Sequence, residues 1–154
     1  MPNRTRRTVG DGRPMNEGEH FTLRCVNTGA TLTLSGLRYL PDPNSHCEYI
    51  AKLAAAPLFA EVEVFDGLTV EAANFFDSLN EAWRGWQGSR DYLSLERHLR
   101  LAATNDSLGH VTVQVTLTNT TGVVRWNAEH PIVVEIGQLA AIGAQARRFF
   151  DHRL

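Results

Sequence analysis

The sequence predicts an α+β domain: an antiparallel sheet of about seven to eight strands, which could be strongly curved, with two helices. Between residues 109 and 117, valine and leucine alternate strictly with threonine and glutamine, the period of a half-buried strand. Apolar residues at helical spacing occur twice, once in the middle of the chain and once at its C-terminal end. Together these patterns predict strands and helices in separate segments.

Four strands are predicted in the first part of the chain. His20 to Val26 and Ala30 to Leu40 alternate apolar and polar side chains on either side of Asn27-Thr28-Gly29, which predicts a β-hairpin. The same alternation continues in His46 to Leu53 and in Leu58 to Phe65, after a proline-containing loop.

A helix is predicted in the middle of the chain, from about Thr69 to about Gly85. Apolar residues recur there at helical spacing: Val70, Ala73, Phe76, Leu79, Trp83 and Trp86.

Four more strands and a closing helix follow. Asp91 to Ala103 is predicted as one strand, although its leucine and arginine content leaves a helical alternative open. After the strand at 109–117, Val123 to Trp126 is the expected return arm of a hairpin, and His130 to Ile136 a further strand. An amphipathic helix is predicted from Gln138 onward. The sequence shows no internal repeat.

The length of 154 residues fits one domain, with residues 1–17 as a disordered N-terminal arm and residues 18–154 as a single α+β domain. The net charge of −2 argues against a general affinity for nucleic acid, and no apolar run is long enough to cross a membrane. The first residues lack the apolar core of a signal peptide, so a cytoplasmic protein is expected. Either Met1 or Met15 could be the native start.

No catalytic residue, cofactor site or metal site is predicted. The six histidines and two cysteines show no HxxxH or CxxC spacing, and the nucleophile elbow and phosphate-binding glycine motifs are missing. Cys25 is expected to lie within a strand, where burial would raise its pKa and make it inert. His110 is expected to stabilise the loop before its strand, with a role as catalytic base as the alternative.

Two segments have the composition of a protein interface, in which aromatic residues and arginine are enriched. Phe59, Glu61, Glu63 and Phe65 share one face of a predicted strand, and Trp83, Arg84 and Trp86 form a corner after the predicted helix. These seven residues are the candidate partner-binding site. Burial under a helix would explain Phe59 and Phe65 equally well.

Several features of the chain, between about Phe21 and Phe150, resemble an uncharacterised family of small actinobacterial proteins without assigned function. The features are Phe-Phe-x-x-Leu before Trp83, the corner Trp83-Arg84-Gly85-Trp86-Gln87-Gly88, the strand opening Gly109-His110-Val111-x-Val113, Trp126, and Gly137-Gln138-Leu139 before Phe149-Phe150. More loosely, the layout is similar to that of WapI-type immunity proteins of bacterial toxin systems, which bind and block a cognate toxin. That resemblance implies one toxin-like protein partner.

The leading functional hypothesis is therefore a non-enzymatic, cytoplasmic, immunity-like protein that binds one cognate protein and needs no cofactor. The alternative is a small-molecule-binding protein or enzyme with a pocket between sheet and helix, lined by Tyr49, Trp83 and Trp86. A structural or oligomerising subunit is the third hypothesis. The sequence predicts neither nucleic-acid nor membrane binding and leaves the oligomeric state open.

Overall fold

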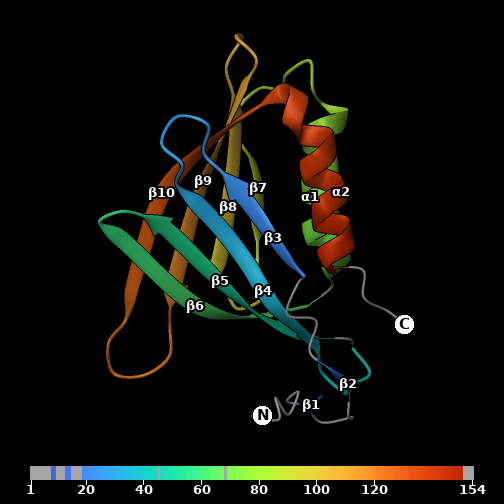
Figure 1. Ribbon diagram of the computed structural model, residues 1–154, viewed down its shortest axis with the longest axis vertical. Coiled ribbons are helices and arrows are strands. Elements are labelled where there is room, and N and C mark those ends of the chain that lie inside the picture. Colours follow the sequence, from blue (N-terminus) through green and yellow to red (C-terminus); the bar gives the residue numbers. More distant parts are fainter. Residues whose placement is uncertain (1–7, 10–12, 15–18, 45, 68, 151–154) are drawn as a thin grey trace, which may run out of the picture.

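The computed structural model describes residues 8–9, 13–14, 19–44, 46–67 and 69–150. In this part of the chain, eight long strands form two antiparallel sheets of four strands each, and two helices lie beside them (Figure 1). The predicted α+β class and the positions of both helices are confirmed. The strands are divided between two sheets that are not closed into a barrel.

The expected N-terminal arm contains a short antiparallel pair, β1 (Thr8–Val9) with β2 (Arg13–Pro14). The rest of residues 1–17, including Met1 and Met15, lies outside the described residues.

The first sheet has the order β3 (His20–Arg24), β4 (Thr31–Tyr39), β5 (Cys47–Ala55) and β6 (Leu58–Asp66). Alternation of apolar and polar side chains places one set of residues of each strand in the core. The buried set is Phe21, Leu23, Leu32, Leu34, Cys47, Tyr49, Ala51, Leu53, Val62 and Val64.

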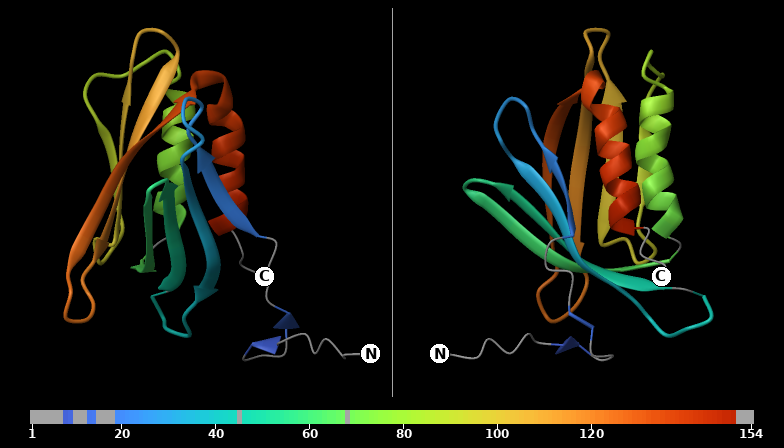
Figure 2. Two further views of the ribbon diagram at one scale, coloured as in Figure 1. Left: turned by 60° about the vertical axis from the view of Figure 1, so that its left-hand side comes forward. Right: turned by 45° about the vertical axis from the view of Figure 1, so that its right-hand side comes forward.

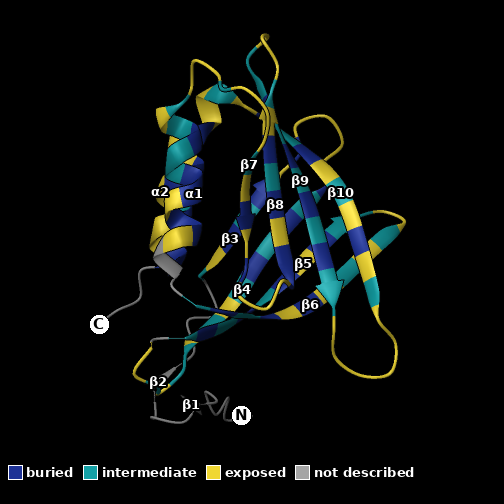
Figure 3. Ribbon diagram, turned by 180° about the vertical axis from the view of Figure 1, so that it is seen from behind, coloured by how far each residue is buried: buried dark blue, intermediate teal, exposed yellow. Residues whose placement is uncertain are grey.

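The second sheet has the order β10 (Trp126–Glu135), β9 (His110–Asn119), β8 (Leu99–Asn105) and β7 (Arg90–Leu93). Buried and exposed residues alternate along its strands, so one face of the sheet belongs to the core and the other meets solvent (Figure 3). The regular valine strand predicted from the sequence is β9.

Two predicted boundaries in this sheet were wrong. The single strand expected over 91–103 is interrupted by a tight turn, in which Arg97 has φ +64° and the Ser94 N–H bonds to the Leu99 carbonyl at 2.9 Å. The two segments expected around Pro131 form one strand, β10. Proline is tolerated there because β10 is an edge strand and position 131 directs its backbone nitrogen away from β9.

The helices are α1 (Thr69–Glu81) and α2 (Leu139–Phe150), which follows the 3₁₀ turn η1 (Ile136–Gln138). Helix α1 ends at Glu81, before the predicted end near Gly85, whose φ of +114° turns the chain. The two helices run antiparallel and in contact (Figure 1). No helix among the described residues has the length and apolarity needed to cross a bilayer.

The structure reveals a repeat that the sequence analysis missed, since each sheet consists of four consecutive strands followed by one helix. The loop between the second and third strand has the same form in both halves. Oδ1 of Asp42 accepts hydrogen bonds from the backbone N–H groups of Asn44 (2.9 Å) and His46 (3.3 Å), and Oδ1 of Asp106 does so from Leu108 (2.8 Å) and His110 (2.9 Å). The ring of His110 also contacts this loop as predicted, with its Nδ1 3.2 Å from Oδ2 of Asp106.

The helix of each half packs beside the first strand of the other half, α2 beside β3 and α1 beside β7. Both views of Figure 2 show the two helices side by side, with β3 next to α2. An ion pair between Asp77 and Arg147 joins the helices, and a Cβ at Gly143 would lie 2.8 Å from Oδ1 of Asp77. Glycine at 143 therefore permits their close approach.

Candidate functional site

The predicted interface residues of β6 lie on the face of the strand that meets solvent. Phe59 is 71% exposed, and Glu61 and Glu63 are exposed beside it in the strand's alternating pattern. Phe65 is half-buried, with its ring centroid 5.1 Å from that of His46. We call Phe59, Glu61 and Glu63 the β6 patch.

The β6 patch combines an exposed aromatic ring with negative charge. Nζ of Lys52 on β5 lies 3.4 Å from Oε1 of Glu61, an exposed pair that solvent screens. Glu63 stands opposite Ile50 on β5 and has no ion pair within the described part of the chain. The patch is therefore suited to a partner surface that offers a positive charge beside an apolar pocket.

The predicted tryptophan corner divides into an exposed and an anchored part. Trp83 is 52% exposed, and the guanidinium of Arg84 lies 5.1 Å from its ring centroid. Trp86 is half-buried, and its Nε1 donates a hydrogen bond to the Ala103 carbonyl at 3.1 Å. Its own carbonyl accepts one from Nδ2 of Asn105 at 2.7 Å. Trp86 thus ties the chain after α1 to β8.

The corner does not join the β6 patch. Figures 1 and 2 show the turn between β5 and β6 apart from the C-terminal end of α1, where the corner begins. The seven candidate residues are therefore spread over separate surfaces. The β6 patch is the surface on which three of them, Phe59, Glu61 and Glu63, lie exposed in a row along one strand.

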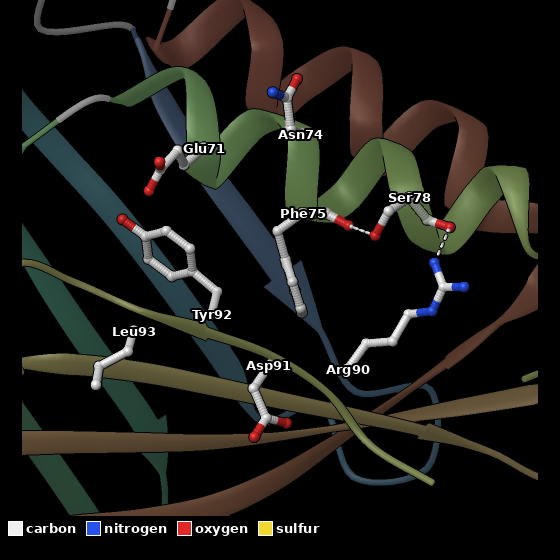
Figure 4. A pocket seen from close by; sticks show the side chains of 8 residues that line it. All are labelled: Glu71, Asn74, Phe75, Ser78, Arg90, Asp91, Tyr92 and Leu93. Carbon is white, nitrogen blue, oxygen red and sulfur yellow. Dashed lines mark hydrogen bonds between the residues drawn. The ribbon is translucent and has the colours of Figure 1, made fainter. Parts of the chain in front are cut away.

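The pocket of the alternative hypothesis does not have the predicted lining. Tyr49 is 1% exposed and lies in the core, away from Trp83 at the surface. A groove of about 560 Å³, open to solvent, lies instead between α1 and β7 (Figure 4). Its lining residues are Glu71, Asn74, Phe75, Ser78, Arg90, Asp91, Tyr92 and Leu93.

The lining pattern shows how the groove is built. The α1 residues are spaced as one face of a helix, whereas β7 contributes all four of its consecutive residues, so the strand presents its edge. Phe75 and Tyr92 meet beneath the groove with ring centroids 6.2 Å apart, and Nη1 of Arg90 donates to the Ser78 carbonyl at 3.0 Å. Arg90 and Tyr92 point toward α1, and Asp91 and Leu93 point away (Figure 4).

A buried carboxylate, that of Asp66 at the end of β6, lies behind this groove. Asp66 is 3% exposed, and its Oδ2 accepts hydrogen bonds from the hydroxyls of Tyr49 (2.9 Å) and Tyr92. Its Oδ1 accepts from the backbone N–H groups of Gly67 (2.8 Å) and Leu95 (3.1 Å). All four donors are satisfied by one side chain, which links the two sheets.

The position of Asp66 could have been found from the sequence. It continues the inward alternation of Val62 and Val64, so a carboxylate occupies a place where the strand pattern calls for an apolar side chain. Burial, reinforced by neighbouring groups that include Asp66, raises the pKa of both Tyr49 and Tyr92. Both hydroxyls therefore stay protonated at neutral pH and act as hydrogen-bond donors, which fits a structural role.

The two cysteines differ in a way that the sequence analysis did not predict. Cys25 follows β3, and although burial opposes its ionisation, hydrogen bonds from the Thr28 side chain and from the Val133 N–H outweigh this and lower its pKa. The expectation of a raised pKa at Cys25 was therefore wrong. Burial and the nearby carboxylates of Asp66 and Glu48 raise the pKa of Cys47 to about 12.

We expect iodoacetamide to alkylate Cys25 at least about tenfold faster than Cys47 at about pH 8, because the thiolate is the reactive form. The rate at Cys47 should continue to rise with pH toward the pKa of about 12. Peptide mass spectrometry of timed samples measures both rates in one experiment. Equal rates at the two sites would contradict the assigned pKa order.

Within the described residues, no group of three or more His, Cys, Asp or Glu side chains is placed to hold a metal ion. Both cysteines are free and buried. The ionisable groups brought together at Asp66 are enclosed in the core.

Fold and site together define an α+β protein built from two four-stranded sheets and an antiparallel helix pair, with an aromatic and acidic patch on one edge strand. The chain belongs to a family of unknown function, DUF6228, which matches residues 24–153. The predicted resemblance to a family without assigned function is thereby confirmed. No curated protein and no solved structure matches the chain, and the looser likeness to WapI-type immunity proteins is not borne out.

Proposed function

We propose that this protein is a non-enzymatic binding protein that holds one cognate protein partner through the β6 patch, as an immunity protein holds its toxin. The observation that supports the proposal is that Phe59 is 71% exposed and shares its strand face with two exposed glutamates, Glu61 and Glu63. Aromatic side chains flanked by charge are typical anchors of protein interfaces, and exposing one in the free protein costs solvation free energy.

The arrangement of the ionisable groups also favours binding over catalysis. The carboxylate of Asp66 is enclosed, and the two tyrosines that contact it are held in their protonated form. The half-buried pair of Asp42 with His46 and the more exposed pair of Asp106 with His110 stabilise hairpin loops. Each of these groups has a structural role that explains its position.

The charges of the patch indicate the chemistry of the partner. Glu61 is partly balanced by Lys52, whereas Glu63 is free to pair with a lysine or arginine of another protein. The Phe59 ring would fill an apolar pocket next to that cation. A basic protein surface with such a pocket is the proposed partner, and a reducing cytoplasm, where both thiols stay free, is the proposed compartment.

The test is a pull-down from a lysate of the native cells, using the tagged wild-type protein and the double variant Glu61→Lys/Glu63→Lys. We expect the wild type to retain one stoichiometric protein, and the variant to bind that protein at least about a hundredfold more weakly, because two attractive contacts become repulsive. Affinity is then measured by calorimetry with the purified partner.

The matched control is Glu129→Lys/Glu135→Lys on β10, which changes the net charge equally at two exposed positions of the other sheet. This control should bind the partner like the wild type. Loss of binding in both variants would indicate a general charge effect and contradict the β6 patch. A wild-type protein that carries a small molecule and no protein would favour the alternative hypothesis of a ligand-binding protein.

A further inference from the structure

The outer edge of β7 has backbone hydrogen-bonding groups that the described part of the chain leaves unpaired. In an antiparallel pair, residues that bond to the neighbouring strand alternate with residues whose N–H and C=O point away. The Ser94 N–H bonds to the Leu99 carbonyl at 2.9 Å, so Tyr92 and Arg90 also bond to β8. The groups of Asp91 and Leu93 therefore point outward, along the α1–β7 groove.

The other half of the fold shows how such an edge can be satisfied. Cys25 closes the turn after β3 as Ser94 does after β7, with its N–H 2.8 Å from the Ala30 carbonyl, so Thr22 corresponds to Asp91. The outward N–H of Thr22 donates to Oε1 of Gln145 at 2.7 Å, and Nε2 of Gln145 donates to the Thr22 carbonyl at 3.2 Å. One carboxamide of α2 thus occupies the β3 edge as a peptide group of a neighbouring strand would.

Helix α1 has no carboxamide at the corresponding place. Gln145 is the seventh residue of α2, and the seventh residue of α1 is Phe75, which is buried against Tyr92. A phenyl ring offers neither a donor nor an acceptor to Asp91. Leu93 is the next outward-facing residue along the edge, and it also lines the groove. At the outward position after it, the Leu95 N–H already donates a hydrogen bond to Oδ1 of Asp66.

We infer that the α1–β7 groove is a docking site for an extended polypeptide segment of another protein, which adds to β7 as a fifth strand of the second sheet. The segment pairs its backbone with the N–H and C=O groups of Asp91 and Leu93, which lie two residues apart as strand addition requires. This site is separate from the β6 patch.

The groove also indicates which side chains the segment carries. Residues facing inward lie over the α1 side of the groove, where the exposed Glu71 has no ion pair among the described residues. Residues facing outward lie beside Asp91 and Leu93, which is 45% exposed. A segment with a lysine or arginine facing Glu71 and an apolar residue beside Leu93 complements the groove.

The test uses the full chain and a library of random heptapeptides displayed on phage. We expect wild-type protein to enrich alternating, basic peptides, and an enriched peptide to shift the amide NMR signals of Asp91 and Leu93 downfield as they gain hydrogen bonds. Leu93→Pro removes one outward N–H and leaves the bonds to β8 in place. It should weaken peptide binding at least about tenfold.

The fold supplies a matched control, Arg24→Pro, which makes the same change at the equivalent outward position of β3. It should bind the enriched peptide as the wild type does. Thermal unfolding followed by circular dichroism verifies that both proline variants fold. No enrichment above background, equal binding by Leu93→Pro and wild type, or shifts confined to β6 would overturn the inference.

Discussion

Replacing Asp66 with alanine is expected to lower the free energy of unfolding by about 3–5 kcal/mol, because four buried donors lose one shared acceptor. The donors are the hydroxyls of Tyr49 and Tyr92 and the backbone N–H groups of Gly67 and Leu95. They belong to both sheets and to the turn after β7, so the loss weakens the contact between the two halves.

Urea unfolding followed by circular dichroism measures this effect, with two further variants for comparison. Asp66→Asn keeps a carbonyl oxygen for the two backbone donors and should cost less than the alanine variant. Tyr92→Phe removes one hydroxyl and should cost about 1–2 kcal/mol. A loss below about 1 kcal/mol in Asp66→Ala would show that water replaces the carboxylate and that the cluster contributes little to stability.

Replacing Phe76 with alanine is expected to cost about 3–5 kcal/mol, since it removes a large buried ring and leaves a cavity. Phe76 is 1% exposed, and its ring centroid lies 4.9 Å from that of Phe21 on β3 and 5.1 Å from that of Phe75. The ring therefore joins α1 to the first sheet.

Phe59→Ala makes the same chemical change at the β6 patch, where the ring is 71% exposed. It should change the free energy of unfolding by less than about 0.5 kcal/mol. Parallel denaturation curves of the two variants provide the comparison. A large loss of stability from Phe59→Ala would mean that the ring packs within the fold, and the proposed role of Phe59 in binding would then fail.

The sequence allowed the type and order of the main elements to be predicted because each depends on a local period. The alternation in β9 and the helical spacing in α2 arise when one face of an element is buried and the other is wet. The same alternation placed Phe59, Glu61 and Glu63 on one strand face, which the structure shows to be exposed. Burial of that face under a helix, left open by the sequence, does not occur for these three residues.

The errors lie where a tight turn or a tertiary contact, and not a sequence period, decides the local structure. The turn at Arg97 divides a leucine-rich segment that looks continuous in the sequence, and Pro131 is accepted because β10 is an edge strand. Trp86 stands at helical spacing but lies beyond the end of α1, where its indole bonds to β8. The partner of Trp86, the Ala103 carbonyl, is 17 residues away, whereas the turn at Arg97 is closed by the nearby Ser94 and Leu99.

The sequence by itself determined that this chain forms an antiparallel α+β fold with its helices in the middle and at the C-terminal end, since local amphipathicity requires no knowledge of neighbours. Only the tertiary structure decided that the strands form two similar halves whose helices each pack beside the other half. It also decided which edges are covered, because Gln145 reaches Thr22 from 123 residues away and Asp66 meets Leu95 from 29 residues away. Those pairings depend on distance in space, which a sequence period does not encode.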